Sequence, residues 1–418
     1  MFAKFKEIFA KRNKDLRKRI LFTLGALAIF IVGTNVKVPG APDVNSDLGF
    51  LELLNVIGGG ALKNSSIFAL GVMPYISASI VIQLLQMDII PYFSDLAKEG
   101  YAGRRKLNRI TRYIGIIVAL VQGIALSIGL LGGDASTFEY IKMAVVLTAG
   151  TAFLLWIGDQ VTQKGVGNGL SLIIMAGIVV SIPYMMEEAF KTFVLGNDNT
   201  FIGIISFIVY LTIYLAIVVG VVFISESERR IPIQYANKTT SAYGAKQTYI
   251  PFKVNAANVI PVIFASALIS IPQVLARFIT NDGYQSFVSK YMNYNTTIGL
   301  IIYLLLIVIF SYVYTILQFR PEEISKNLQQ NGGYIPGVRP GVETKKYITS
   351  VLLRITTFGT LFLVIIAALP ILFQNYSHVD NTNISIGGTG LLIVVGVALE
   401  TFKQIESVLE QKEYKGRF

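Results

Sequence analysis

The chain is dominated by long stretches that carry no charged side chain. Ten such runs, each free of Asp, Glu, Lys and Arg, lie at about residues 20–36, 65–87, 113–131, 143–158, 168–186, 201–224, 256–276, 297–319, 355–374 and 387–399. A helix needs roughly 20 mainly apolar residues to cross the hydrocarbon core of a bilayer. With 53% apolar and only 15% charged residues over 418 positions, the runs predict an all-α polytopic membrane protein with ten transmembrane helices.

Residues that would carry chemistry are scarce. The chain has no cysteine and a single histidine, His378, so disulfide chemistry, thiolate chemistry and a histidine-based metal site are excluded. The sequence GVGNG at 165–169 lacks the preceding strand and the Lys-Ser/Thr pair of a phosphate-binding P-loop. We therefore predict no enzyme activity, no metal and no cofactor.

The positive charges fall unevenly on the two sides of the predicted bundle. If the chain starts in the cytoplasm, 30 of its 36 Lys and Arg residues lie on inner segments, and the outer ones are Lys37, Lys63, Lys142, Lys191, Arg277 and Lys290. Because Lys and Arg are depleted from translocated loops, both termini are predicted to be cytoplasmic. The net charge of +11 then lies largely on the inner face, where it suits anionic lipid, RNA or an acidic protein, or acts as a topology signal alone.

Two cytoplasmic ends flank the predicted spans. Residues 1–19 place Phe2, Phe5, Ile8 and Phe9 at helical spacing among basic residues, which is typical of an amphipathic helix in the membrane interface. Residues 405–418 form a polar tail. Two further inner segments are long: 225–255 predicts a protruding hairpin, and 320–347 predicts a short helix followed by a Gly- and Pro-rich turn.

An internal repeat relates the second and seventh runs. VMPYISAS at 72–79 and VIPVIFAS at 259–266 agree at five of eight positions. Each run is second in a set of five, and five is odd, so the halves 20–186 and 200–404 would enter the membrane in opposite directions. The outer loop 187–199 would connect them. Inverted repeats are typical of transport proteins whose working site lies between the halves, and the matched Pro74 and Pro261 predict paired interruptions of two helices.

The segment before the second run is too short and too rich in glycine to be a span. We predict a re-entrant half-helix at about 50–64, with a flexible joint at Gly58, Gly59 and Gly60. The middle of the spans carries no ionisable residue, which disfavours a proton-coupled or ion-coupled carrier. Val72, Ile76, Ile174, Ile178 and Ile263 lie there instead, a pattern that by itself is more typical of packed core than of a pore.

Six motifs carry a family resemblance. They are SSIFALGVMPYISASIVIQLL, KGVGNGLSLIIMAGI, ERRIPIQYA, PFKVNAANVIPVIFAS, YIPGVRPG and GGTGLLIVV, in order from residue 65 to 395. Together they closely resemble the bacterial SecY family, the central subunit of the protein-conducting channel of the cytoplasmic membrane. The first span has Ile31 where family members commonly carry Arg, which leaves open whether the chain is a housekeeping channel or an accessory paralogue.

The resemblance implies an hourglass pore between the two halves. It implies a ring of aliphatic side chains at the waist of the pore, formed by Val72, Ile76, Ile174, Ile178, Ile263 and Ile393. It identifies 50–64 as a plug that covers the ring and swings on its glycine joint. The second and seventh spans become a lateral gate, to which we assign Pro74, Ser77, Gln83, Gln122, Asn255 and Pro261, with the three amides as a polar cluster that holds the gate closed.

The resemblance also implies partners. Arg229, Arg230 and Arg339 would contact the SecA motor ATPase or the ribosome, SecE and SecG would be the small subunits, and signal sequences and unfolded secretory polypeptides would be the substrates. Hydrophobic segments would leave sideways into lipid. The alternative is a small-solute secondary transporter with inverted repeats, which predicts a polar, solute-sized site at mid-membrane.

Overall fold

A computed structural model describes most of the chain. The described residues are 13–42, 55–86, 90–131, 135–196, 200–235, 248–255, 257, 259–276, 281–293, 296–377 and 387–415. Their helices are α2 (Lys14–Gly33), α4 (Met73–Leu85), α5 (Pro91–Lys98), α6 (Tyr101–Leu131), α7 (Thr137–Lys164), α8 (Gly169–Phe190) with a π-helical end η2 (Lys191–Leu195), α9 (Thr200–Glu226), α10 (Ile260–Leu275), α11 (Asp282–Tyr291), α12 (Thr297–Phe319), α13 (Pro321–Gln330), α14 (Val342–Ser377) and α16 (Gly387–Lys415). Each of the ten predicted runs overlaps one of these helices. Residues 1–12 of the predicted amphipathic segment lie outside the described residues.

Six helices of the described chain are long and apolar enough to cross a membrane. They cover Tyr101–Leu131, Thr137–Lys164, Gly169–Leu195, Thr200–Glu226, Thr297–Gln330 and Val342–Leu369. α9 is apolar on all sides, yet only 11% of its most apolar window is buried, which is what a helix that faces lipid requires. α4 and α10 are apolar but shorter. The chain is therefore a multi-pass membrane protein.

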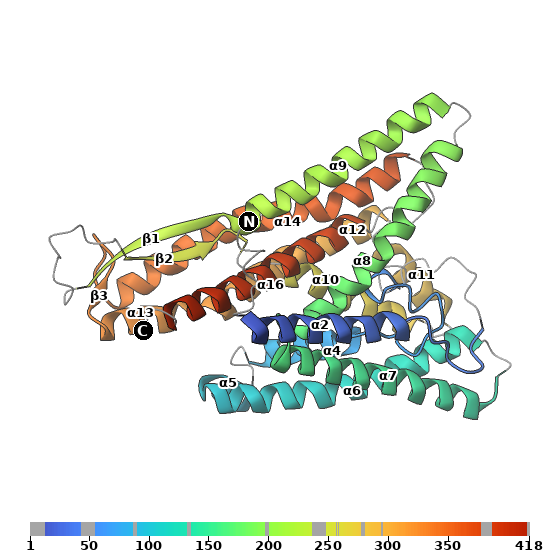
Figure 1. Cartoon of the computed structure of the whole chain (residues 1–418), viewed down its shortest axis with the longest axis horizontal. Helices are drawn as coiled ribbons and strands as arrows, with labels where there is room; N and C mark the ends of the chain where they lie inside the picture. Colours follow the sequence, from blue (N-terminus) through green and yellow to red (C-terminus); the bar gives the residue numbers. More distant parts are fainter. Residues whose placement is uncertain are drawn as a thin grey trace.

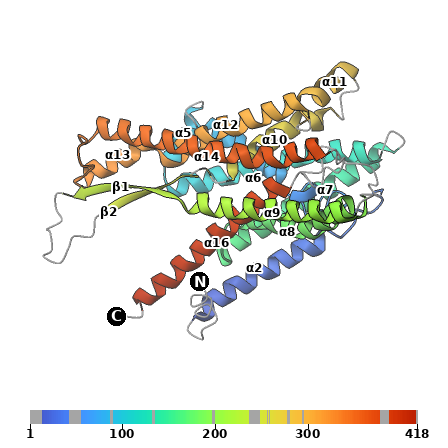
Figure 2. The ribbon, with the colours of Figure 1, turned by 90° about the horizontal axis from the view of Figure 1, so that it is seen from above.

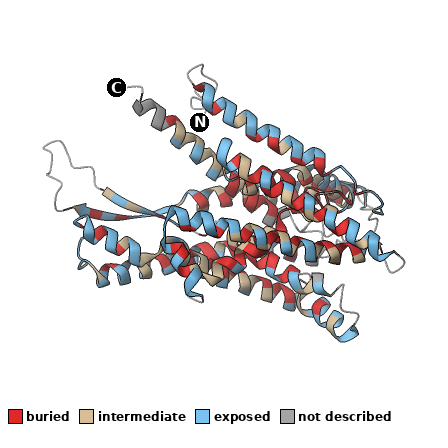
Figure 3. Ribbon diagram, turned by 90° about the horizontal axis from the view of Figure 1, so that it is seen from below, coloured by how far each residue is buried: buried red, intermediate tan, exposed pale blue. Residues whose placement is uncertain are grey.

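The helices form two groups with α8 between them. In Figure 1, α2, α4, α5, α6 and α7 lie together, whereas α9, α12 and α14 lie on the opposite side, and α8 crosses between the groups. α2 begins and α16 ends toward the end that carries the β-strands (Figure 2). Buried residues gather where the two groups meet, and the outer faces of the helices are exposed (Figure 3). The core thus lies between the groups, as an inverted two-half architecture requires.

The matched prolines begin helices and do not interrupt them. Pro74 is the second residue of α4, and Pro261 is the second residue of α10. In the first turn of a helix the missing amide hydrogen has no intrahelical acceptor, so proline is tolerated there without a kink. The prediction of paired interruptions within two helices is therefore wrong. The equivalence of the two prolines holds, because each takes the same place at the start of a short apolar helix.

A small sheet projects from one end of the bundle (Figure 1). Strands β1 (Glu228–Tyr235) and β2 (Thr248–Lys253) pair antiparallel, which confirms the predicted hairpin. β3 (Gly333–Tyr334) pairs with the far end of β1, in the order β2-β1-β3. The two long inner segments therefore form one unit, with an apolar core that includes Ile231, Phe252, Leu328 and Ile348.

The apolar run of α12 ends at a backbone reversal. Arg320 adopts φ 39°, a left-handed conformation that stops the helix, and Pro321 then starts the polar helix α13. α13 confirms the short helix predicted after residue 320. This break separates the membrane-crossing part of α12 from the projecting unit.

Candidate functional site

All six aliphatic side chains predicted for the pore ring belong to, or pack against, the largest apolar core of the described residues. Val72, Ile76, Ile174, Ile178 and Ile393 are buried members of the largest apolar core, and Ile263 packs against it half-buried. They come from α4 and its preceding residue, α8, α10 and α16. Because α4 and α8 belong to the first half and α10 and α16 to the second, this core includes residues from both halves.

The described part of the predicted plug is seated against α8. Val56, Ile57 and Ala61 belong to the same apolar core as the ring residues. The backbones meet at two glycines: a Cβ added to Gly59 would stand 3.1 Å from the Cα of Gly177, and a Cβ added to Gly177 would overlap the carbonyl oxygen of Ile57. Such a close approach is possible only without side chains.

A serine adds a polar contact to this seat. The Ser181 hydroxyl lies 3.3 Å from the carbonyl oxygen of Val56 and 3.2 Å from that of Gly177, so it can donate to either. Gly177 and Ser181 are one turn apart on α8, and Ile174 and Ile178 lie on the same helix. One helix therefore carries both ring side chains and the seat of the plug.

The three glycines form a structured turn. Gly59 and Gly60 have φ of 69° and 80°, in the left-handed region that favours glycine. The amide of Gly60 donates to the carbonyl of Asn55, and the Asn55 side chain accepts from the amide of Lys63. Residues 50–54, about a third of the predicted half-helix 50–64, lie outside the described residues.

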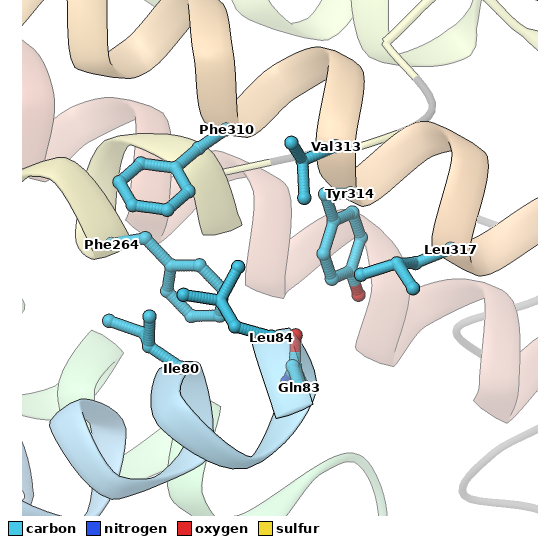
Figure 4. A pocket seen from close by; sticks show the side chains of 8 residues that line it. All are labelled: Ile80, Gln83, Leu84, Phe264, Phe310, Val313, Tyr314 and Leu317. Carbon is cyan, nitrogen blue, oxygen red and sulfur yellow. The ribbon is translucent and has the colours of Figure 1, made fainter. Parts of the chain in front are cut away.

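α4 and α10, the predicted gate helices, lie side by side. At one end of their contact a small crevice separates α4 from α10 and α12. Figure 4 shows its wall, which is mostly apolar and aromatic: Ile80, Gln83, Leu84, Phe264, Phe310, Val313, Tyr314 and Leu317. The rings of Phe264 and Phe310 meet edge to face at 5.8 Å.

The serine hydroxyls and the Gln83 amide of the two predicted gate helices find their partners on their own side of the gate. The Ser77 hydroxyl donates to the carbonyl of Met73, and Gln83 donates to Ser79, both on α4. On α10, the Ser266 hydroxyl donates to the carbonyl of Val262 and lies 3.5 Å from the Tyr303 hydroxyl of α12. Among the described residues, no hydrogen bond joins α4 to α10.

The predicted polar cluster of three amides is not formed. α6 packs against α4 where Gly115 meets Tyr75, and the two helices run antiparallel, as successive spans must. From that point Gln83 lies eight residues toward one end and Gln122 seven residues toward the other, which at 1.5 Å per residue places them about 20 Å apart. Asn255 is buried beside Gly359 of α14. The prediction placed the amides by sequence motif, whereas the antiparallel packing of α4 and α6 separates them.

The predicted docking arginines lie on the projecting unit. Arg229 and Arg339 are exposed, and neither has an ion pair within the described part of the chain. Arg230 instead contacts Glu228 at 2.6 Å and lies over the Tyr249 ring at 4.8 Å; the hydrogen bond with Glu228 raises the pKa of Arg230. The three arginines therefore divide into two free cations and one that is already paired.

An acidic residue on α13 is neutralised in the same unit. Glu322 contacts Lys345 at 2.8 Å and Lys326 at 3.3 Å. The hydrogen bonds from Lys345 and Lys326 lower the pKa of the Glu322 carboxyl. Because two lysines share this one carboxylate, one positive charge remains there in addition to that of Arg339.

Several residues of the site were missed by the sequence analysis. They are Gly177 and Ser181 at the plug seat and Phe264, Phe310 and Tyr314 at the crevice. The small pair Ala176–Gly177 beside two ring positions is a signal that could have indicated a close approach of backbones. Within the described residues no group of three or more His, Cys, Asp or Glu side chains could hold a metal ion.

Comparisons with known proteins were made on sequence and on structure. The SecY family model matches residues 66–402. The protein translocase subunit SecY of Staphylococcus epidermidis is 46% identical over 429 residues, which cover 100% of this chain and 99% of the relative.

Solved structures of channels share the fold. One of them is a SecY structure in which the plug domain stabilises the closed state of the translocation channel and maintains a membrane seal. It matches with a TM-score of 0.61 at 17% identity, and the match covers 94% of this chain and 92% of that one. Sec61 in the canine ribosome-channel complex from the endoplasmic reticulum matches with a TM-score of 0.63 at 18% identity, with the same coverage.

Proposed function

The chain belongs to the SecY family, and from this premise we propose that it forms the channel through which a translocase passes unfolded secretory polypeptides across the bacterial cytoplasmic membrane and releases hydrophobic segments sideways into lipid. The observation that supports the proposal is the apolar core shared by the two halves, to which the ring candidates and Val56, Ile57 and Ala61 of the predicted plug belong. Such a core closes a pathway without offering a binding site for a solute.

The ring acts as the ion barrier. Val72, Ile76, Ile174, Ile178, Ile263 and Ile393 provide no oxygen that could replace the hydration shell of an ion, so ions meet an apolar constriction. Aliphatic side chains can also separate around an extended polypeptide and close behind it. The ring therefore explains how a protein passes while small ions are retained.

The plug seat holds the channel closed at rest. The contact of Gly59 with Gly177, and of Val56 with Ser181, fixes the end of the plug on the helix that carries Ile174 and Ile178. Because backbones meet there without intervening side chains, the seat fits one position of the plug only. Opening the pore requires this contact to break.

The gate opens sideways between α4 and α10. Only apolar contacts join these helices among the described residues, and in lipid such contacts have no hydrophobic driving force behind them. A signal sequence with ten leucine-like residues gains about 3–6 kcal/mol on entering the membrane, at roughly 0.3–0.6 kcal/mol each. This is enough to compete with a contact that has no interhelical hydrogen bond.

The projecting unit is the docking surface for the energy source. The free cations Arg229 and Arg339 suit the phosphates of ribosomal RNA or an acidic surface of SecA. SecE, SecG and anionic lipids complete the assembly, as the family resemblance implies. The channel itself is no enzyme, so SecA, the ribosome or the membrane potential supplies the energy.

Purified protein with its small subunits, reconstituted in vesicles, tests the proposal. With SecA and ATP, a secretory precursor should become protected from added protease, and vesicles without the channel should give no protection. Uptake of small solutes without passage of the precursor would establish the alternative, a secondary transporter. The crevice lining favours the channel, because its mostly apolar wall offers a solute only the polar groups of Gln83 and Tyr314.

The docking role has its own test. Arg339→Glu should reduce SecA-driven transport, since repulsion replaces attraction at an exposed site far from the ring. Lys142→Glu, which reverses an exposed cation on α7 that has no ion pair among the described residues, is the matched control for charge. Equal transport by both variants and the parent would remove Arg339 from the docking surface.

Orientation is tested by labelling. The natural chain has no cysteine, so single cysteines in place of Lys142, Lys290 or Arg339 can be probed with a maleimide that does not cross membranes. In intact cells the first two should react and the third should not. Labelling of Arg339→Cys in sealed cells would reverse the proposed topology, with both termini outside.

A further inference from the structure

A short amphipathic helix, α11, follows the gate helix α10. On a helical wheel Tyr284, Phe287, Val288 and Tyr291 share one face, and Asp282, Gln285, Ser286, Ser289 and Lys290 form the other. Val288 is buried and Tyr284 is half-buried, whereas 47% of Phe287 is exposed. The apolar face is thus only partly covered by protein, and its open edge is aromatic.

The length of α10 fixes the depth of α11. α10 has 16 residues, about 24 Å at 1.5 Å per residue, which is less than the roughly 30 Å of a hydrocarbon core. The end of α10 therefore reaches the boundary of the core at most, and α11 begins within a few residues of it. Figure 2 shows α11 at the end of α12 that lies away from the strands. α11 thus lies at the level of lipid headgroups.

Two hydrogen bonds attach α11 to α10. The Tyr284 hydroxyl donates to the carbonyl of Pro272 at 3.1 Å, and the Gln273 amide donates to the carbonyl of Met292. Pro272 and Gln273 belong to the last turns of α10. The start and the end of α11 are therefore both held by the gate helix.

The open edge has the composition of a membrane interface. The Phe287 and Tyr291 rings contact each other at 5.0 Å between centroids, and the Lys290 ammonium lies 5.5 Å from the centre of the Tyr291 ring. Tyrosine, which has an apolar ring and a polar tip, concentrates at the headgroup level. A lysine stem can lie along apolar surface while its ammonium stays in water. Every phospholipid offers that ammonium a phosphate.

We propose that α11 is an interfacial helix that inserts Phe287 and Tyr291 into the headgroup layer of the outer leaflet, with Lys290 at the lipid phosphates. In this position α11 anchors the outer end of the gate helix α10 at a fixed depth. The proposal rests on the proposed function only for the side of the membrane and for the role of α10 as gate. Insertion itself follows from the amphipathic face and the depth of α11.

Tryptophan fluorescence tests the insertion without any transport assay. Trp156 is the only tryptophan, so Trp156→Phe gives a silent background for Phe287→Trp on the open edge and Ser286→Trp on the polar face. In phospholipid nanodiscs the tryptophan at 287 should emit at shorter wavelength than the tryptophan at 286, and lipids brominated near the headgroup should quench it more strongly. Aqueous acrylamide should quench it several-fold less than the tryptophan at 286. Tyr291→Trp serves as a second reporter on the same face.

Equal acrylamide quenching at 286, 287 and 291 would overturn the insertion, as would quenching of all three by lipid bromines. The attachment to α10 is tested in the same nanodiscs by hydrogen exchange. Tyr284→Phe removes the hydroxyl that reaches Pro272 and should accelerate exchange within 282–291 while α12 is unchanged. Unchanged exchange in α11 would show that the helix is not held by this bond. A failed transport assay would contradict the proposed function and leave both measurements valid.

Discussion

The plug seat and the lateral gate close the same pore with opposite kinds of contact. At the seat, Gly59 and Gly177 bring two backbones together, and Ser181 adds a hydrogen-bonding hydroxyl. At the predicted gate, α4 and α10 touch through aliphatic and aromatic side chains, and a small crevice remains beside them. One contact is tight and permits a single geometry. The other is loose and joined by no hydrogen bond among the described residues.

The difference shows how one channel can seal against ions and still admit many sequences. A backbone contact loses its attraction when displaced by a fraction of an ångström, so the seat is either formed or broken. Side chains such as Leu84 and Phe264 can change rotamer and repack around an incoming segment. We conclude that the plug seat accepts a single geometry, whereas the gate helices can repack around segments of different sequence.

Locking the gate should have the largest effect. The crevice places Ile80 and Leu84 of α4 opposite Phe264 of antiparallel α10, so a cysteine at Ser77 should form a disulfide with one position scanned along 266–271. The bond holds two Cα atoms within about 7 Å, which is incompatible with the passage of a helix about 10 Å wide. Transport of a secretory precursor should stop when the pair is oxidised and return on reduction.

A long bifunctional cross-linker at the same cysteines is the matched control, since it spans an open gate. Unimpaired transport through the fully oxidised short lock would mean that α4 and α10 do not part, and the loose contact would then have another role.

Opening the ring should have the next largest effect. Replacing Ile76, Ile174, Ile178 and Ile263 together by serine removes the apolar constriction, so reconstituted bilayers should conduct ions without a substrate. The plug seat on Gly177 stays intact in this variant, and any remaining block measures what the seat contributes alone. A resting membrane as tight as the parent would show that these residues are ordinary core.

Adding one methyl group at the plug seat should have a clear but smaller effect on the resting channel. Gly177→Ala places a Cβ against the Ile57 carbonyl, and overpacking of this kind costs about 1–3 kcal/mol. The population of unseated plug should rise roughly 5- to 150-fold. Single-channel recording should show more frequent resting openings. Gly25→Ala is the control, because a Cβ on Gly25 meets nothing within 4 Å; equal behaviour of the two variants would contradict a tight seat.

Adding one carbon atom to a side chain at the gate crevice should have the smallest effect. Val313→Ile adds one methylene to a side chain that lines the crevice, where empty space accepts it, so thermal unfolding and transport should match the parent within the scatter of the assay. A loss as large as that of Gly177→Ala would show that the gate is packed as tightly as the seat, and the contrast between the two contacts would fail.

The sequence predicted best those elements whose structure depends on residues close together in the chain. Each run without charge overlaps a helix, because a helix in lipid must satisfy its own backbone and so needs only length and apolarity. The hairpin at β1 and β2 and the helix α13 followed from turn residues and a proline within a few positions of the element itself. The ring residues followed from the family motifs alone, and their role as a ring stays a prediction.

The rest depends on which helices pack together. Gln83 and Gln122 both lie in spans of the first half, but only the antiparallel register of α4 and α6, fixed where Gly115 meets Tyr75, separates them. The contact of Gly59 with Gly177 has no periodic signature, since each glycine matters only because the other lies opposite. Pro74 and Pro261 were misread because the start of each helix was set too early in the sequence.

The three-stranded sheet has a consequence for how the protein is made. Its third strand pairs position 333 with position 235, so α10 and α12 are synthesised between the two partners. At about 5–20 residues per second, translation delivers β3 on the order of 5–20 s after β1. During that interval a nascent chain exposes the edge of β1 and lacks the loop of Arg339. A half-made chain therefore lacks part of the proposed docking surface until α10 and α12 have been synthesised.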